Sequence, residues 1–549
     1  MNVTRKWIFK GLLLLPLLAL AAFCVFYLTH DYAYLTDWYE AIPGPFFRKS
    51  HWRREFFTPQ TAQAGRLYCG LALLLIPLLA WTVLRQKTSP PISLNPADRL
   101  PQTIVALLAL ILGTANALLS TPAIDEYQSA FFMGGAHPFR ALSHYPVPNN
   151  HVLFNTLTSL IATPETALVW GKIIAIGAFA VAAVLIYRWF RTLSLSPAVA
   201  AWLAGLSLLI FPVWGFSGQA RGYTIYLLAH WWALLLTTRY LQTGDKRHLV
   251  LFPVAVWMGY AALPTFIYFH LALTLWVGCL ALTRRKIYLP FWKAQVIGSI
   301  AAYLFYVPLL CFSGFRAFSA HRWVAHLAWQ EFSFPPLGPF RDYLTGYGAV
   351  GLLLGIGTLL LALRLLLSSK NRWMGMLFLA VWIGCNLVVL WMRQPSFSRQ
   401  LIGLYSVSVG VALYSLRLLI ENAGPVVSGK KGLKTLAALS LLGALGVFKI
   451  NYHRLNDALY LYDIAGTERR IEILLDRIPA GATVGFTDDA FHARALWQRA
   501  GKKPTPFMAA TYRVLLEDTD SPLPTDTLVF SYGDLELYTS RDKNPETKD

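Results

Sequence analysis

Long apolar runs separated by short polar breaks dominate the chain up to about residue 450. Runs such as 12–28, 103–119 and 374–391 carry almost no charge over roughly the 20 residues that a helix needs to cross a bilayer. Backbone groups inside lipid must bond within their own segment, so these runs predict helices. The expected spans, about thirteen in all, are residues 8–28, 66–84, 102–120, 168–187, 197–214, 220–240, 249–263, 264–283, 294–313, 347–367, 373–392, 400–420 and 434–450.

The pair of spans between 249 and 283 is divided only by Leu263-Pro264-Thr265. A proline with an extended residue before it either ends a helix or kinks it. One long kinked helix in this stretch would change both the span count and its parity.

After about residue 451 the pattern changes to evenly spaced charges, which is typical of a soluble segment. The run 467–478 has apolar residues on one face of a helix, whereas 482–486 and 527–531 read as short buried strands. The sequence thus predicts a mainly α fold: a polytopic transmembrane helical bundle with a small C-terminal extracytoplasmic α/β domain. The expected divisions are 1–100, a two-span extension with an outer loop; 101–450, the main transmembrane module; and 451–549, the α/β domain.

Composition supports the membrane class, with 56% hydrophobic and only 14% charged residues. The formal net charge of +20 would suggest nucleic acid in a soluble protein, but here Lys and Arg cluster between apolar segments and no recognition module accompanies them. We therefore expect anionic membrane lipids as partners and no nucleic acid. All five cysteines fall in apolar segments, so no disulfide framework and no CxxC metal site is expected.

Positive charge in the short loops sets the expected orientation, because such clusters stay in the cytoplasm. With the N-terminus inside, the segments 29–65, 121–167 and 314–346 and the C-terminal domain lie outside. The loop 29–65 is itself basic, with Arg48, Lys49, Arg53 and Arg54, so the rule is not obeyed everywhere. The cytoplasmic clusters are Arg85 and Lys87, Arg188 and Arg191, Lys246 and Arg247, Arg284 to Lys286, Lys370 and Arg372, and Lys430 to Lys434.

Two adjacent carboxylates, Asp125 and Glu126, follow the third span at the outer membrane edge, just before Tyr127. An ionisable group where a helix leaves lipid is costly unless it faces water, a partner or a substrate. A carboxylate there can accept a proton from a hydroxyl nucleophile. The structural alternative is that Asp125 caps the short helix that follows.

The same outer loop holds His137-Pro-Phe-Arg140 and the run His144-Tyr-Pro-Val-Pro-Asn149-Asn150-His151. These side chains suit sugar hydroxyls, phosphates or a divalent metal. The prolines prevent one helix from presenting His144 and His151 together, so the spacing is poor for a metal cage.

Arginines stand at two further outer positions. Arg221, in Ala220-Arg-Gly-Tyr223, begins the sixth span, and Arg393 and Arg399 flank Pro395 before the twelfth. A guanidinium there either grips a phosphate with two parallel hydrogen bonds or anchors the helix end at the interface. Two arginine sites on one face favour a pocket for a lipid phosphate.

Taken together, the motifs around Asp125-Glu126, Pro148-Asn-Asn-His151, Ala220-Arg221-Gly-Tyr223 and Pro395 to Arg399 resemble those of the GT-C glycosyltransferases, especially bacterial relatives of protein O-mannosyltransferases and of the lipid A aminoarabinose transferase. The resemblance covers roughly residues 100–420 in order. It implies a multi-pass protein of the bacterial inner membrane with its active site on the periplasmic side. It further implies a polyprenyl-phosphate-linked sugar donor and a glycan, lipid or protein acceptor. The outer soluble domain is expected to help select the acceptor.

By the same resemblance, Asp125 is the catalytic base, with Glu126 beside it for acceptor or metal. Arg221, Arg399 and Arg393 bind the donor phosphate. A divalent cation, Mg²⁺ or Mn²⁺, stays open, with Asp125, Glu126 or His151 as its ligands. The substrate-binding candidates are Tyr127, His144, Asn149, Asn150, His151 and Tyr223.

The chain departs from the family pattern by having two spans and a long loop before the helix that precedes Asp125, so Asp37 or Glu40 in that loop competes for the catalytic role. Two other functions stay open. An O-antigen ligase or polymerase would need the arginines and not Asp125, and a transporter or flippase of lipid-linked sugars would suit many spans equally well. No intramembrane carboxylates spread through the spans as coupled transport commonly requires.

Overall fold

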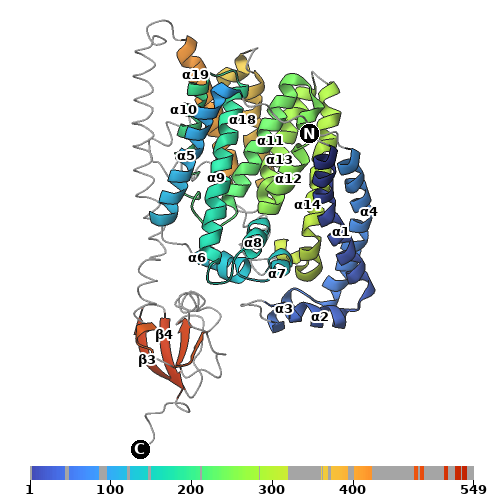
Figure 1. Cartoon of the computed structure of the whole chain (residues 1–549), viewed down its shortest axis with the longest axis vertical. Helices are drawn as coiled ribbons and strands as arrows, with labels where there is room; N and C mark the ends of the chain where they lie inside the picture. Colours follow the sequence, from blue (N-terminus) through green and yellow to red (C-terminus); the bar gives the residue numbers. More distant parts are fainter. Residues whose placement is uncertain are drawn as a thin grey trace, which may run out of the picture.

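The computed structural model of the chain consists mostly of helices that run alongside one another, with a small sheet near the C-terminus (Figure 1). The structure describes residues 3–43, 49–85, 95–119, 124–145, 150–209, 213–282, 285–319, 360, 363–368, 372–393, 401–422, 475–479, 482–486, 512–516, 526–532 and 535–540. The long helices are α1 (Val3–Thr29), α4 (Pro59–Arg85), α5 (Pro96–Leu119), α9 (Ala167–Thr192), α10 (Pro197–Leu208), α11 (Tyr223–Thr243), α12 (Phe252–Ala262), α13 (Ile267–Ala281), α14 (Arg285–Ser313), α18 (Arg372–Met392) and α19 (Ile402–Asn422).

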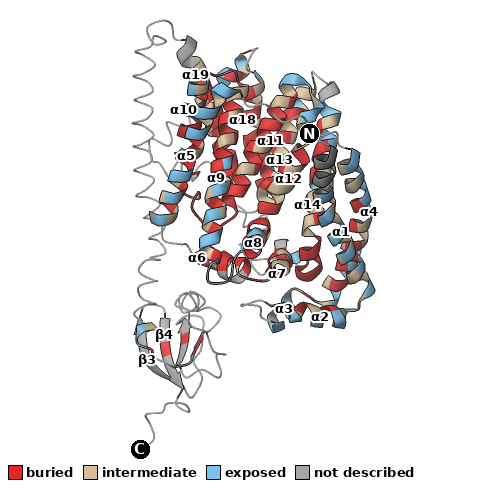
Figure 2. Ribbon diagram, viewed as in Figure 1, coloured by how far each residue is buried: buried red, intermediate tan, exposed pale blue. Residues whose placement is uncertain are grey.

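Among the described residues, six helices are long and apolar enough to cross a membrane. They are Pro59–Arg85, Pro96–Leu118, Ala167–Thr192, Pro264–Ala281, Tyr288–Ser313 and Arg372–Met392. Leucines such as Leu67 and Leu74 of α4 and Leu118 of α5 are exposed. Exposed residues are frequent along α4 and α5, whereas the helices in the middle of the bundle are mostly buried (Figure 2). Apolar surface on the outside of long apolar helices is what lipid contact requires, so this is a membrane protein.

Most of the expected spans fall on the helices just named. Residues 434–450 lie outside the described part, as does most of 347–367, so the total of about thirteen spans stays a prediction. Between 249 and 283 the structure has two helices, α12 and α13, joined by the short turn η3 (Pro264–Phe266).

The direction of α13 follows from its contacts with α14. Thr274 of α13 bonds Gln295 near the beginning of α14, at 2.9 Å, whereas Tyr306 farther along donates to the Tyr260 carbonyl of α12 at 2.7 Å. The chain therefore turns back after α12, and one continuous kinked helix is excluded. With 11 residues, α12 covers about 16 Å, about half of a bilayer core.

The expected span 197–214 is wrong in its second part. α10 ends at Leu208, and residues 213–222 form a buried irregular segment before α11 begins at Tyr223. Non-helical backbone inside a bundle needs partners, and α5 supplies them: the Asn116 amide donates to the carbonyls of Trp214 and Gly215 at 2.9 and 3.1 Å. A Cβ on Gly218 would lie 2.4 Å from the backbone nitrogen of Ala117, so this segment packs directly on α5.

Five short helices gather at one end of the bundle: α2 (Tyr32–Ala41), α3 (Lys49–Glu55), α6 (Ile124–Tyr127), α7 (Pro138–Ser143) and α8 (Val152–Ser159) (Figure 1). At the opposite end of α5, Arg191 donates to Asp98 at 2.6 Å. The described parts of the segments 29–65 and 121–167 thus lie at the other end of the bundle from Arg191.

The C-terminal region contains a four-stranded sheet of order β1-β2-β4-β3. Its strands are β1 (Val484–Phe486), β2 (Tyr512–Leu516), β3 (Asp526–Tyr532) and β4 (Leu535–Ser540). β1 and β2 are parallel, and β4 pairs antiparallel with β2 and β3. β1 and β3 overlap the two segments predicted as strands, but β2 and β4 were not predicted. Most of the helix expected over 467–478 lies outside the described residues, so the α/β character of a separate domain remains a prediction.

Candidate active site

The candidate site is built by the segment between α5 and α9, which folds as α6, the π-helix η1 (Gln128–Gly134), α7 and α8. α7 begins in the way its sequence predicts, with Pro138 in the first turn and the His137 side chain accepting from the Phe139 N–H at 3.2 Å. These short helices place the polar residues of the loop against the irregular segment before α11.

Asp125 and Arg221 form the central contact of the site. Arg221 Nη1 donates to Asp125 Oδ2 at 2.9 Å. The Arg221 side chain is only 4% exposed, whereas that of Asp125 is 24% exposed. Asp125, which lies in the first turn of α6, thus combines a buried cationic partner with a partly exposed carboxylate.

Glu126, unlike the partly exposed Asp125 beside it, is buried. Its Oε2 atom accepts the backbone N–H of Ala220 at 2.7 Å. This bond fixes the irregular backbone immediately before Arg221. We therefore read Glu126 as a residue that positions the Ala220-Arg221 segment, which differs from the expected role in binding acceptor or metal.

An aromatic wall completes the surroundings of Arg221. The guanidinium carbon lies 4.8 Å from the centroid of the Tyr223 ring, and His151 meets the same ring edge to face at 4.8 Å. Between them Gly222 keeps the contact close, because a Cβ there would lie 3.0 Å from the Cβ of His151. Asp125, Arg221, Tyr223 and His151 thus share one site, as the sequence predicts.

A chain of buried amides connects this site to the rest of the loop. Ser129 Oγ donates to Asn155 Oδ1 at 2.8 Å, and Asn155 Nδ2 donates to Asn150 Oδ1 at 2.8 Å. Asn150 Nδ2 in turn donates to the His144 carbonyl at 2.6 Å. Asn150 therefore acts as a link within the loop. Sequence reasoning gave no role to Ser129 or Asn155, because neither stands in a recognisable motif.

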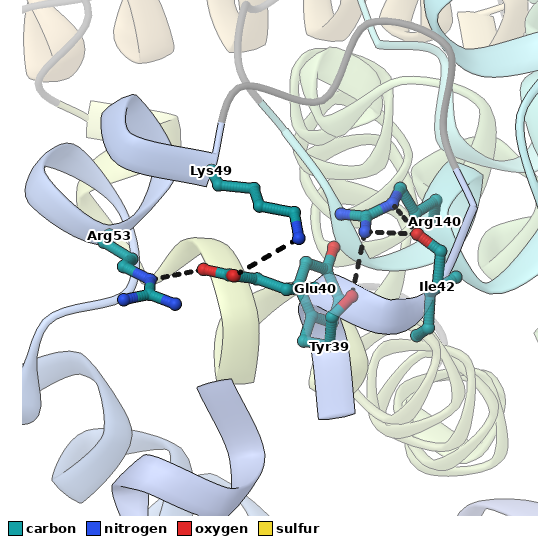
Figure 3. A network of polar contacts seen from close by, with 6 residues as sticks. All are labelled: Tyr39, Glu40, Ile42, Lys49, Arg53 and Arg140. Atoms are coloured by element: carbon teal, nitrogen blue, oxygen red, sulfur yellow. Dashed lines mark hydrogen bonds and ion pairs between the residues drawn. The ribbon is translucent and has the colours of Figure 1, made fainter. Parts of the chain in front are cut away.

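Arg140 joins the end of α2 to the segment that builds the site (Figure 3). Its buried guanidinium donates from Nη2 to the carbonyls of Tyr39 and Ile42, at 2.8 and 2.6 Å, where α2 ends. It also lies over the Tyr39 ring, 4.6 Å from the centroid. Burial lowers the pKa of Arg140, but a guanidinium remains charged at neutral pH. The α2 region is therefore part of the support of the site, a role that the sequence did not predict.

Glu40, which competed with Asp125 for the catalytic role, is engaged in ion pairs. Arg53 Nε contacts one carboxylate oxygen, and Lys49 Nζ lies 3.6 Å from the other (Figure 3). The hydrogen bond from Arg53 holds the pKa of Glu40 below its ordinary value. Glu40 therefore belongs to the α2–α3 contact.

The remaining predicted residues divide into two groups. Tyr127 and His144 are buried at this same end of the molecule. Arg393 follows α18 with a φ of 47°, and Arg399 and Asn149 lie outside the described residues, so their roles stay predictions. Within the described ranges no group of three or more His, Cys, Asp or Glu side chains is placed to hold a metal ion. Asp125 and Glu126 bond Arg221 and the Ala220 N–H instead, so these two carboxylates do not fit the divalent-cation site that the sequence left open. We derive no step through a metal.

The chain was compared with known proteins. No protein-family model matches it, and no curated protein matches it by sequence.

Proposed function

We propose that the protein is a membrane glycosyltransferase of the GT-C type, which moves a sugar from a polyprenyl-phosphate donor to an acceptor hydroxyl. The observation that carries the proposal is the 2.9 Å contact between Asp125 and Arg221 at one end of a transmembrane bundle. A group that takes a proton and a cation that suits phosphate lie together there. Transfer from a lipid phosphate requires both.

The proposed reaction is a direct displacement at the anomeric carbon. The acceptor oxygen forms a bond to that carbon while the bond from the carbon to the phosphate oxygen breaks. The hydroxyl proton passes to Asp125, and the electron pair leaves with the polyprenyl phosphate, whose charge Arg221 neutralises. Attack opposite the leaving group inverts the anomeric configuration.

The ion pair also suggests an order of events. A phosphate that binds the Arg221 guanidinium competes with Asp125 for the same donor atoms, since Nη1 already bonds the carboxylate. Donor binding therefore loosens the pair and makes the carboxylate available to the acceptor hydroxyl. That hydroxyl approaches the exposed part of the Asp125 carboxylate.

Other residues have supporting roles in this scheme. Tyr223 and His151 form the wall beside the guanidinium and contact the sugar, together with Tyr127, His144 and Asn149. Arg399 and Arg393 form a second contact to the donor phosphate. The site lies on the periplasmic face of a bacterial inner membrane, and the C-terminal segment lies on the same side and contributes to acceptor choice.

The test uses the full-length protein in lipid nanodiscs, incubated with synthetic polyprenyl-phosphate sugars and envelope extracts as acceptor source. We expect free polyprenyl phosphate to appear, with the sugar on a new product detected by mass spectrometry. A flippase would leave the donor intact in this assay. A ligase or polymerase would give product equally well from the Asp125→Asn variant. Either result contradicts the proposal.

A further inference from the structure

Three of the five cysteines lie against one another where α1, α4 and α14 meet. The sulfur atoms of Cys69 and Cys311 are 3.5 Å apart, although 242 positions separate them in the chain. Cys24 belongs to the same buried cluster. All three side chains are completely buried. The other two cysteines, Cys279 and Cys385, belong to α13 and α18.

The backbones around the cluster are held close by specific contacts. Tyr27 of α1 donates its hydroxyl to the Cys311 carbonyl of α14 at 3.1 Å, and the Cys311 thiol lies 3.6 Å from the Gly65 carbonyl of α4. Gly65 has no room for a side chain, since a Cβ would lie 2.4 Å from the Tyr27 hydroxyl. The helices are thus fixed in the register that brings Cys69 beside Cys311.

We propose that Cys69 and Cys311 are a disulfide-forming pair that links α4 covalently to α14. A disulfide needs a sulfur separation of about 2.05 Å, so the two sulfurs must approach by roughly 1.5 Å, which small rotations of the side chains provide. A buried thiol is usually a small hydrophobe. Packing alone, however, does not require two thiols from distant helices to face each other.

The oxidant in this proposal is a small or protein disulfide, as found on the outer side of the membrane. Because both side chains are buried, the helices must first open locally. One exposed thiolate then attacks the oxidant and releases one thiol, which leaves a mixed disulfide. The second cysteine sulfur then displaces the remaining thiol. Two electrons and two protons pass from Cys69 and Cys311 to the oxidant, which ends as two thiols.

The link would lie next to the candidate site. Two residues after Cys311, Ser313 Oγ donates to the Ser143 carbonyl at 2.9 Å and accepts from the Tyr145 N–H at 3.0 Å. The bond would therefore join the helices of the N-terminal extension to the end of α14 that holds the site's loop. It does not depend on the reaction proposed above.

The test treats membranes that contain the full-length protein with diamide, blocks free thiols with N-ethylmaleimide and identifies linked peptides by mass spectrometry. We expect a Cys69–Cys311 peptide in the wild type and in the control variants C24S and C279S, none in C69S or C311S, and its loss after reduction. A predominant Cys24–Cys69 peptide would overturn the proposal. Labelling of Cys24 by N-ethylmaleimide at a raised temperature would show that small reagents reach the cluster. If Cys69 and Cys311 remained unlinked after diamide treatment at that temperature, the proposal would also be overturned.

Discussion

Arg221 donates to Asp125 across 96 positions of sequence, at 2.9 Å, so two motifs from separate loops meet as an ion pair. The carboxylate reaches the surface, whereas the guanidinium is buried among protein groups. A buried cation whose partner is accessible can exchange that partner for an incoming anion. This property connects the fold with the proposed binding of a lipid phosphate.

Replacing Arg221 by Lys tests the geometry of phosphate binding. Lysine keeps the charge but loses the planar fork that binds two phosphate oxygens at once. We expect polyprenyl phosphate to bind at least about 10-fold more weakly, which corresponds to about 1.4 kcal/mol. Titration of the protein in nanodiscs, followed by native mass spectrometry, measures this. Unchanged affinity would assign Arg221 to a purely structural role.

Glu126 provides a test of the positioning role. Glu126→Gln keeps an oxygen that can accept from the Ala220 N–H, whereas Glu126→Ala leaves that buried donor unpaired at a cost of about 1–3 kcal/mol. We expect the alanine variant to unfold at a lower temperature and the glutamine variant to stay close to the wild type. Thermal unfolding in detergent distinguishes them. Equal loss in both variants would show that the negative charge itself is needed.

Arg140 allows a test of the contact between α7 and the end of α2. Arg140→Ala removes the donors to the carbonyls of Tyr39 and Ile42, and hydrogen bonds to a charged group contribute about 1.5–3 kcal/mol each. We expect faster proteolysis of α2 and α3 and a lower unfolding temperature. The control Arg54→Ala changes an exposed side chain of α3, whose partner Glu55 is also exposed, and should have an effect within about 0.5 kcal/mol. Similar effects of the two variants would contradict the assignment.

Gly222 tests the close contact beside the guanidinium. Its φ of −73° suits any residue, so Gly222→Ala acts only through the added Cβ, 3.0 Å from the Cβ of His151. We expect His151 to shift and sugar transfer to fall several-fold, on the order of 1 kcal/mol. Gly177→Ala in α9 is the matched control, because no atom lies within 4 Å of its Cβ. Sugar transfer by Gly222→Ala at the wild-type rate would show that the contact between His151 and Tyr223 is not needed for the reaction.

Local pattern predicted much of the fold. Apolar runs gave most helices, and β1 and β3 were found from short apolar stretches bounded by turn residues. The irregular segment 213–222 was predicted only in part: residues 215–219 were left between two spans, but 213–214 and 220–222 were assigned to those spans, because the backbone partner that holds the segment, Asn116, lies in α5. The return of the chain after α12 was left open because a proline within an apolar run fits both a kink and a turn.

The site was predictable in part. Asp125, Arg221, Tyr223 and His151 stand in short motifs with chemically reactive or charged residues, and the structure brings them together. The contact of Arg140 with α2 and the approach of Cys69 to Cys311 were not predicted, because the partners are backbone carbonyls and a thiol far away in sequence. No periodicity records such contacts; they depend on how whole helices pack.

The most direct test of the central claim compares the wild type with Asp125→Asn in transfer from a polyprenyl-phosphate sugar. The amide keeps the shape of the carboxylate but cannot take a proton, and loss of a general base reduces rates by about 10²–10⁴-fold. We predict a reduction in that range, with polyprenyl phosphate still bound and the protein still folded. Transfer by Asp125→Asn at the wild-type rate would contradict the account.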